Sequence, residues 1–202
     1  MSEVTTTLDL RRVEAEATSK TTLGFWTYLM TDCVLFAALF AVYAVQHGNT
    51  FGGPDGYELF KLPYVLVETL VLLISSFTCG LALLALQKRD KTMVLTWLAV
   101  TFVLGAVFLG MELSEFHAMA AEGNSWRRSG FLSSYFTLVG THGLHITIGL
   151  IWMAVAGTLA WKKGLTASIH KRLTLLGMFW HFLDVVWIFI FTVVYLFGSL
   201  HL

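Results

Sequence analysis

The run Trp180-His-Phe-Leu-Asp-Val-Val-Trp187 decides the fold of this chain, because it places a histidine and a carboxylic acid inside the last long apolar stretch. An ionisable side chain at bilayer depth is costly and persists where it faces other helices or a partner group. The preceding apolar stretch repeats the pattern in Thr141-His-Gly-Leu-His145. We therefore expect membrane helices that bury polar groups between them.

Composition fixes the broad class. The 202 residues are 56% hydrophobic and only 13% charged, which is outside the range of soluble domains. Crossing a hydrocarbon core of about 30 Å takes roughly 20 residues, and five stretches are long enough: residues 23–46, 63–87, 92–119, 131–161 and 173–200. The sequence predicts an all-α integral membrane protein, a five-helix bundle forming one domain over residues 23–200 after a polar tail, residues 1–22.

The basic residues predict the orientation of the bundle. All 13 Lys and Arg lie outside the five stretches, ten of them in the N-terminal tail and in the second and fourth loops. Because cytoplasmic segments carry the excess of Lys and Arg, we expect a cytoplasmic N-terminus and a periplasmic C-terminus. The net charge of zero argues against a nucleic-acid partner.

Each predicted helix gathers polar or small side chains on one face at a period of about 100° per residue. Four of these faces consist of Tyr28, Asp32, Tyr43 and Gln46; Glu68, Ser75, Cys79 and Ala82; Thr101, Gly105, Glu112 and Glu115; and His181, Asp184, Thr192, Tyr195 and Ser199. Polar groups have no partners among acyl chains. We expect these faces to point at neighbouring helices.

Three interpretations of the histidines and acids follow from their spacing. His142 and His145, like His181 and Asp184, are three residues apart and share a helix face, so they could ligate iron or zinc, or the histidines could clamp a haem. The favoured interpretation makes them mutual hydrogen-bond partners, with His181 and Asp184 tying the last helix to the fourth or the first. Glu112 and Glu115 lie in the outer half of their helix, within reach of protons or lipid headgroups.

Three sequence runs resemble a known family. They are Gly140-Thr-His-Gly-Leu-His-Ile-Thr-Ile-Gly149, the run from Trp180 to Trp187, and Ser114-Glu-Phe-His117, and they are similar to subunit III of the haem-copper terminal oxidases. The likeness covers most of residues 23–200. Two more runs, Gly24-Phe-Trp-Thr-Tyr-Leu-Met-Thr-Asp-Cys-Val-Leu-Phe36 and Val67-Glu-Thr-Leu70, most resemble the five-helix subunit III of bo-type ubiquinol oxidases.

The resemblance implies a non-catalytic subunit of a proton-pumping respiratory oxidase. Haem and copper would belong to the catalytic subunit I, and this chain would pack against subunits I, II and IV and bind phospholipid in a cleft between helices. It implies structural polar ties at His142, His145, His181, Asp184 and Tyr195. It leaves Asp32, Glu68, Glu112 and Glu115 as candidates for the lipid cleft or for a proton-collecting surface.

Two alternatives stay open from the sequence. Subunit III of a cytochrome c oxidase differs in the electron donor, which this chain would not touch. An independent membrane metalloenzyme or proton-coupled transporter would need bound metal, or transport by the purified chain alone.

Overall fold

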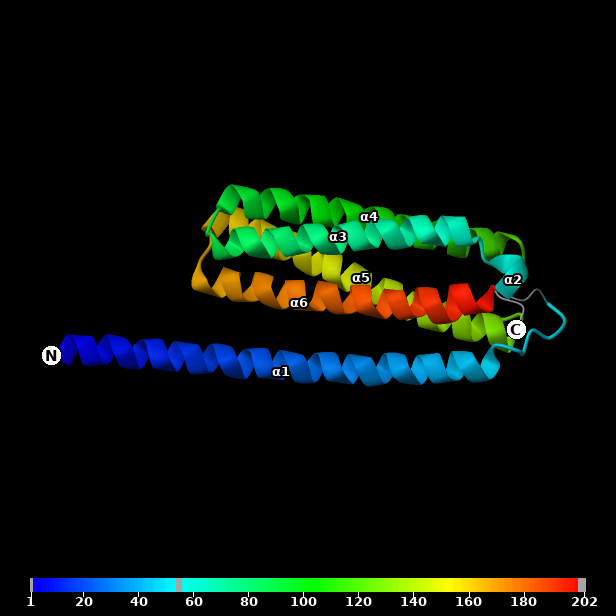
Figure 1. Ribbon diagram of the computed structural model, residues 1–202, viewed down its shortest axis with the longest axis horizontal. Coiled ribbons are helices and arrows are strands. Elements are labelled where there is room, and N and C mark those ends of the chain that lie inside the picture. The colour runs from blue at the N-terminus through cyan, green and yellow to red at the C-terminus, as the bar shows by residue number, and fades with distance from the viewer. Residues whose placement is uncertain (1, 54–55, 200–202) are drawn as a thin grey trace. The chain divides into compact units, whose positions relative to one another are not determined.

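The computed structural model describes residues 2–53 and 56–199, with side chains described from residue 19 onward except at residue 58. The chain forms two compact units, residues 1–35 and residues 36–202. The described residues hold α1 (Ser2–Gln46), α2 (Gly56–Leu59), α3 (Leu62–Gln87), α4 (Lys91–Ala121), α5 (Gly130–Lys163) and α6 (Ala167–Ile190), which continues as the π-helix η1 (Phe191–Leu196) (Figure 1). The first unit is the N-terminal part of α1, and the other elements belong to the second.

The predicted all-α membrane fold is confirmed. Five helical segments are long and apolar enough to cross a membrane: Ser19–Gln46, Leu62–Gln87, Lys91–Ala121, Gly130–Lys163 and Ala167–Leu196. The backbone of α1 is helical from Ser2, well before the predicted start near residue 23. Hydropathy identifies the part of a helix that suits lipid, whereas a helix can continue beyond that part.

Capping side chains set the starts of three helices. The side chains of Asp90, Ser129 and Thr166 accept hydrogen bonds from backbone N–H groups three residues later, at 3.1, 3.2 and 3.4 Å. Such caps satisfy donors that the first helical turn leaves unpaired. α6 therefore begins at residue 167 rather than near residue 173, where the apolar stretch was predicted to start.

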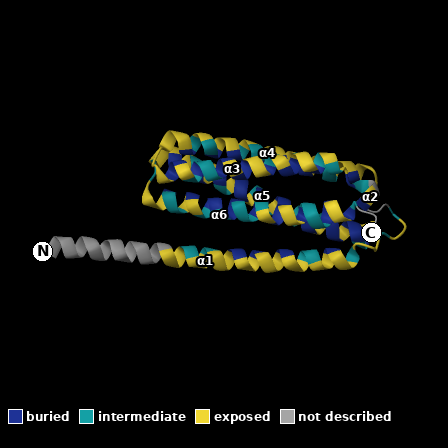
Figure 2. Cartoon of the chain, viewed as in Figure 1, coloured by how far each residue is buried: buried dark blue, intermediate teal, exposed yellow. Residues whose placement is uncertain are grey.

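Helices α3 to α6 form a ring in which each packs against two others. α3 contacts α4 and α6, and α5 contacts the same two helices (Figure 1). Along α3, α5 and α6, buried and exposed residues alternate (Figure 2). The buried residues include Glu68, Ser75, Cys79 and Ala82 on α3, so the polar face predicted for this helix does point inward.

Two glycines let helices approach a buried tryptophan. A Cβ atom added to Gly105 on α4 would lie 2.7 Å from the ring of Trp180, and one added to Gly149 on α5 would lie 3.1 Å from it. Small residues allow this close approach between membrane helices. Trp180 on α6 is 1% exposed and fills the centre of the ring.

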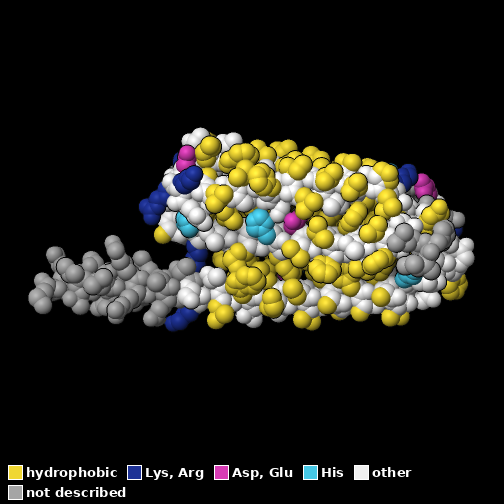
Figure 3. Space-filling model, viewed as in Figure 1, with side chains coloured by type: hydrophobic (Ala, Val, Ile, Leu, Met, Phe, Trp, Pro, Cys, Tyr) yellow, Lys and Arg dark blue, Asp and Glu magenta, His cyan; other side chains and the backbone are white. Residues whose placement is uncertain are grey.

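The outer surface of the bundle suits lipid. On the face in Figure 3, apolar side chains cover the middle of the bundle, and Lys and Arg gather toward its ends. A few histidine and acidic atoms show among the apolar side chains. These exceptions are the groups that need an explanation.

Candidate functional site

Five side chains form a polar cluster inside the end of the bundle that carries α2. They come from α3, α4, α5 and η1, and we call them the acid–tyrosine cluster: Glu68, Glu112, Glu115, Tyr135 and Tyr195. The hydroxyl of Tyr195 donates to Oε2 of Glu115 at 3.0 Å, and the hydroxyl of Tyr135 reaches the same oxygen at 3.4 Å. The two hydroxyls are 2.9 Å apart. The cluster thus joins three helices through one carboxyl oxygen.

Local backbone features place these groups. Glu112 and Glu115 are three residues apart on α4 and share a face. Tyr195 lies in the π-helix, a wider winding often found at functional sites. Gly143 on α5 makes room for Glu112, because an added Cβ would lie 2.6 Å from its Oε1.

The carboxyl groups of the cluster lack enough partners. Both oxygens of Glu68 and Oε2 of Glu112 are buried without a hydrogen bond, and these residues are 0% and 1% exposed. Glu68, Glu112 and Glu115 lie close enough to interact electrostatically. An isolated buried carboxylate is expensive, and such a group neutralises instead.

Aromatic rings enclose the cluster. The ring of Phe60 lies 4.8 Å from that of Tyr195 and 5.2 Å from that of Tyr135. Trp187 lies 6.1 Å from Tyr195 and donates its indole N–H to the hydroxyl of Thr69 at 3.0 Å. Phe60 thus packs against both tyrosines of the cluster, and Trp187 packs against one of them.

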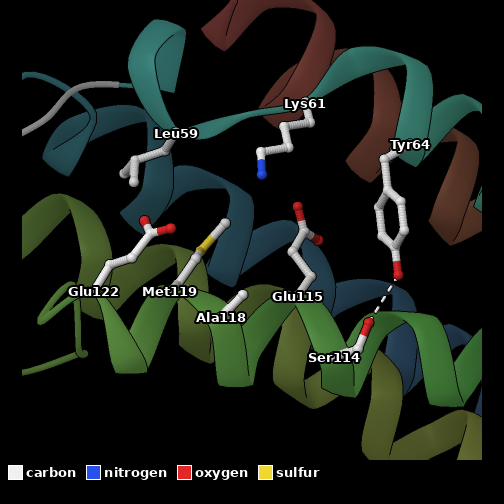
Figure 4. A pocket seen from close by; sticks show the side chains of 8 residues that line it. All are labelled: Leu59, Lys61, Tyr64, Ser114, Glu115, Ala118, Met119 and Glu122. Carbon is white, nitrogen blue, oxygen red and sulfur yellow. Dashed lines mark hydrogen bonds between the residues drawn. The ribbon is translucent and has the colours of Figure 1, made fainter.

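One pocket reaches the cluster from outside. It has a volume of about 330 Å³, and its lining is Leu59, Lys61, Tyr64, Ser114, Glu115, Ala118, Met119 and Glu122 (Figure 4). The side chains of Lys61 and Glu115 point toward each other across it. The hydroxyls of Tyr64 and Ser114 lie 2.8 Å apart at one side.

A second polar group lies farther along α3 and α6, and we call it the His181 group: Ser76, His181 and Asp184. Nδ1 of His181 lies 2.8 Å from the hydroxyl of Ser76, and the carboxyl group of Asp184 lies near the same hydroxyl. A hydroxyl has one proton to donate, so if Ser76 donates to Asp184, His181 donates to Ser76. His181 and Asp184 are both partly exposed.

Next to the His181 group, a set of buried hydrogen bonds lies inside the ring of helices. Trp180 donates its indole N–H to the hydroxyl of Ser75 at 3.0 Å. The hydroxyls of Thr78 and Thr101 lie 2.9 Å apart and join α3 to α4. These bonds tie the centre of the ring of helices.

Comparison with known proteins identifies the family. The family model of cytochrome c oxidase subunit III matches residues 14–199. This chain belongs to the cytochrome c oxidase subunit III family. It is 59% identical over 180 residues to the cytochrome bo(3) ubiquinol oxidase subunit 3 of Pseudomonas aeruginosa, covering 89% of this chain and 86% of that protein.

Other relatives of the subunit III family agree. The cytochrome bo(3) ubiquinol oxidase subunit 3 of Buchnera aphidicola is 44% identical over 93% of this chain and 96% of its own length. A probable quinol oxidase subunit 3 of Staphylococcus aureus is 39% identical over 100% of this chain and 99% of its own length. With the five membrane spans, these relatives make the chain a multi-pass protein of the bacterial inner membrane.

The structure gives this subunit III chain a different set of helix ties from the one expected. His181 was expected to join the fourth or the first predicted helix, and this was wrong: its partner Ser76 is on α3, the second span. Periodicity gives the face of a residue but not the neighbour of that face. His142 does join its helix to the last one, because its Nε2 donates to the carbonyl of Leu183 at 3.3 Å.

The remaining predicted residues are placed as follows. Nδ1 of His145 donates to the carbonyl of Thr141 one turn earlier on its own helix, at 2.7 Å, and its ring lies 5.3 Å from that of Phe36. Asp32 lies on α1 in the first unit. The roles assigned to His142, His145, His181, Asp184, Tyr195 and the four candidate carboxyls stay predictions.

Sequence reasoning missed several partners. Tyr135, Thr69 and Ser76 all make hydrogen bonds to other helices. Tyr135 lies two turns before His142 on the same face of α5, and this spacing could have revealed it. Thr69 and Ser76 are adjacent to the predicted Glu68 and Ser75, one position off the expected stripe.

The arrangement can hold helices together and can hold protons. Across the described ranges 19–53 and 56–199, no group of three or more His, Cys, Asp or Glu is placed to hold a metal ion. Carboxylic acids and phenols both donate and accept hydrogen bonds. The metal content of the chain stays a prediction for elemental analysis.

Proposed function

We propose that this chain is the non-catalytic subunit III of a proton-pumping bo-type ubiquinol oxidase, which reduces O2 to water. The single observation that carries the proposal is the 59% identity to a cytochrome bo(3) ubiquinol oxidase subunit 3 over 86% of its length. The relatives at 44% and 39% identity, also named as quinol oxidase subunits, support the same electron donor. The chain supports its neighbours and performs no redox step.

Its partners are the catalytic subunit I, which holds the haem and copper, together with subunits II and IV. The α3–α6 face supports a protein partner, because His181 and Asp184 are only partly buried there among exposed apolar side chains such as Ile74, Phe77 and Val185. Ionisable groups facing acyl chains are costly. A neighbouring membrane helix with polar side chains removes that cost.

The orientation follows from charge. With a cytoplasmic N-terminus the α2 end of the bundle faces the periplasm, and the polar tail of residues 1–22 precedes a single domain over residues 23–200. The ten basic residues assigned to the cytoplasmic side against three on the other support this orientation. Phospholipid binds in a cleft between helices, for which Asp32 stays a predicted contact; Glu68, the other predicted contact, is 0% exposed and belongs to the enclosed cluster.

The test is removal of the chain from the complex. A tagged copy should purify with a partner that shows haem absorbance. A complex without the chain should keep its haem and copper spectra and its initial O2 reduction, while melting at a lower temperature, because binding stabilises a folded partner by mass action. Normal haem spectra with no O2 consumption from the first turnover would contradict a supporting role.

A second candidate is subunit III of a cytochrome c oxidase, favoured by the description of the matching family. The electron donor separates the two: the purified complex should oxidise ubiquinol and not reduced cytochrome c. An independent metalloenzyme or proton-coupled transporter would instead require about one metal per chain, or transport by the isolated chain. Neither outcome is expected.

A further inference from the structure

We propose that the acid–tyrosine cluster is a proton-exchange site, in which Glu115 takes up and releases a proton through the pocket at the α2 end of the bundle. This goes beyond the proposed function, because a supporting subunit needs no exchanging proton. The inference rests on three properties of the cluster: its charge, its access and its hydrogen bonds.

The first property is an excess of acids over cations. Glu68, Glu112 and Glu115 interact with one another electrostatically, and the predicted spans contain no Lys or Arg. Both oxygens of Glu68, which is 0% exposed, have no hydrogen-bond partner. If all three of these neighbouring carboxyl groups were ionised, they would repel one another strongly in a medium of low dielectric constant. Glu68 and Glu112 therefore hold their protons and surround Glu115 with neutral acids.

The second property is one-sided access. Glu115 is the one member of the cluster that lines the 330 Å³ pocket, whereas Glu68 and Glu112 are closed off. A water molecule occupies about 30 Å³ of liquid volume, so the pocket admits several. Water can thus reach the Glu115 carboxyl from one side.

The third property is support for both charge states of Glu115. Its ionised form accepts from Tyr195 and Tyr135 and faces Lys61 across the pocket (Figure 4). Its protonated form is uncharged and so avoids the cost of holding a charge in a partly enclosed site. A group held between such opposing influences can change charge with little rearrangement.

The exchange step involves one proton and no electrons. A hydronium ion relayed by water in the pocket gives its proton to the Glu115 carboxylate, which leaves a carboxylic acid and a water molecule. The acid returns the proton to water by the same route. Tyr195 and Tyr135 keep their own protons throughout. Their hydroxyls donate to the carboxylate and turn to accept from the acid, since a phenol does both.

The titratable and charged groups around Glu115 come from every packed element. α3 and the residue before it contribute Glu68, Tyr64 and Lys61. α4 contributes Glu112, and the residue after it contributes Glu122. α5 contributes Tyr135, followed two turns later by His142, whose Nδ1 is buried without a partner. η1 contributes Tyr195. Lys61 is the one cation among these described groups, and it is exposed.

The test is infrared spectroscopy of the intact complex at different pH values. One C=O stretching band, that of protonated Glu115, is expected to disappear reversibly as pH rises, to shift in heavy water, and to be lost in Glu115→Gln. Glu122→Gln is the matched control, because Glu122 lines the same pocket but is solvent-exposed, and it should leave the band unchanged. Lys61→Met should move the disappearance of the band to higher pH, since the nearby cation is gone.

One further variant keeps the result decisive. Tyr195→Phe retains the ring and removes one hydrogen bond to Glu115, so the band should shift in frequency without being lost. Glu68 and Glu112 should contribute bands that do not change with pH and that persist in Glu115→Gln. If no pH-dependent C=O band were lost in Glu115→Gln, the proposal would be overturned and the cluster would be a structural tie. The haem spectrum of the same samples reports assembly, so failure of the site and failure of the proposed subunit role are told apart.

Discussion

The acid–tyrosine cluster and the His181 group are both polar, but they are closed off differently. Phe60 and Trp187 cover the tyrosines of the cluster inside one chain, and the cluster meets the outside at the pocket that Glu115 lines. The His181 group lies on the α3–α6 face with two of its three members partly exposed. We infer that the acid–tyrosine cluster holds together helices of this subunit, whereas the His181 group contacts a neighbouring subunit.

The surrounding lipid explains why each polar group must be covered. Lipid offers no hydrogen bonds, so a polar group must be enclosed by its own chain or covered by another. Because the cluster is covered by its own chain, substitutions there should lower the stability of the subunit. Because the His181 group would be covered by a neighbouring subunit, substitutions there should weaken assembly of the complex. Substitutions in the two regions should therefore separate these two readouts.

The largest expected effect is that of Trp187→Ala. Trp187 is 0% exposed, packs against Phe108 at 4.7 Å and donates to Thr69. Its removal should destabilise the subunit by about 3–5 kcal/mol, the usual cost of emptying a large aromatic site, and should be measured as melting temperature in the purified complex. Trp161→Ala, at a site 65% exposed, is the control and should change little. Equal melting temperatures for Trp187→Ala and Trp161→Ala would contradict a stabilising role for Trp187 beside the cluster.

Gly143→Ala should have the next largest effect. The new methyl would lie 2.6 Å from Oε1 of Glu112, so the carboxyl must move, at a cost of about 1–3 kcal/mol for overpacking. Gly140→Ala is matched on the same helix, because its methyl would lie 3.7 Å from the ring of Phe116. A melting temperature lowered in the second variant as much as in the first would show that Glu112 is free to move.

Asp184→Leu tests the other region and should act on assembly. It leaves Ser76 and His181 without their acid partner, at about 1 kcal/mol, the net value of an intramolecular hydrogen bond. Retention of the subunit by the haem-containing partner should fall, and Asp184→Asn should be milder. If Asp184→Asn abolished quinol oxidation in a fully assembled complex, Asp184 would have a proton-transfer role instead.

Much of this contrast could be predicted from sequence. Hydropathy over five stretches predicted the five spans, and the spacing of Glu68, Ser75 and Cys79 predicted a buried face on α3. The five spans follow from the apolar surroundings of a membrane helix, and the buried face of α3 follows from the helical period. Neither depends on which helices are neighbours.

The rest depends on contacts between distant parts of the chain. Ser76 and His181 are separated by 105 residues, and nothing in the period of either helix pairs them. Tyr195 reaches Glu115 from a π-helix, a winding that the apolar pattern around residues 191–196 does not signal. The acid–tyrosine cluster was therefore visible in sequence only as separate acids on separate faces.

The smallest expected effect is that of Ser76→Ala in the His181 group, and Ser75→Ala at the adjacent, enclosed serine is its comparison. Ser76→Ala removes a hydroxyl from the His181 group and should cost about 0.6 kcal/mol, the mean for side-chain hydrogen bonds between membrane helices. Ser75→Ala leaves the enclosed indole N–H of Trp180 without its acceptor and should cost more, about 1–3 kcal/mol. Melting temperature and retention by the haem-containing partner should be measured for both. Ser75→Ala should lower the melting temperature more, and Ser76→Ala should lower retention more. If both variants changed the melting temperature and the retention equally, the position of a serine on the α3–α6 face would not decide whether its hydroxyl contributes to assembly or to stability.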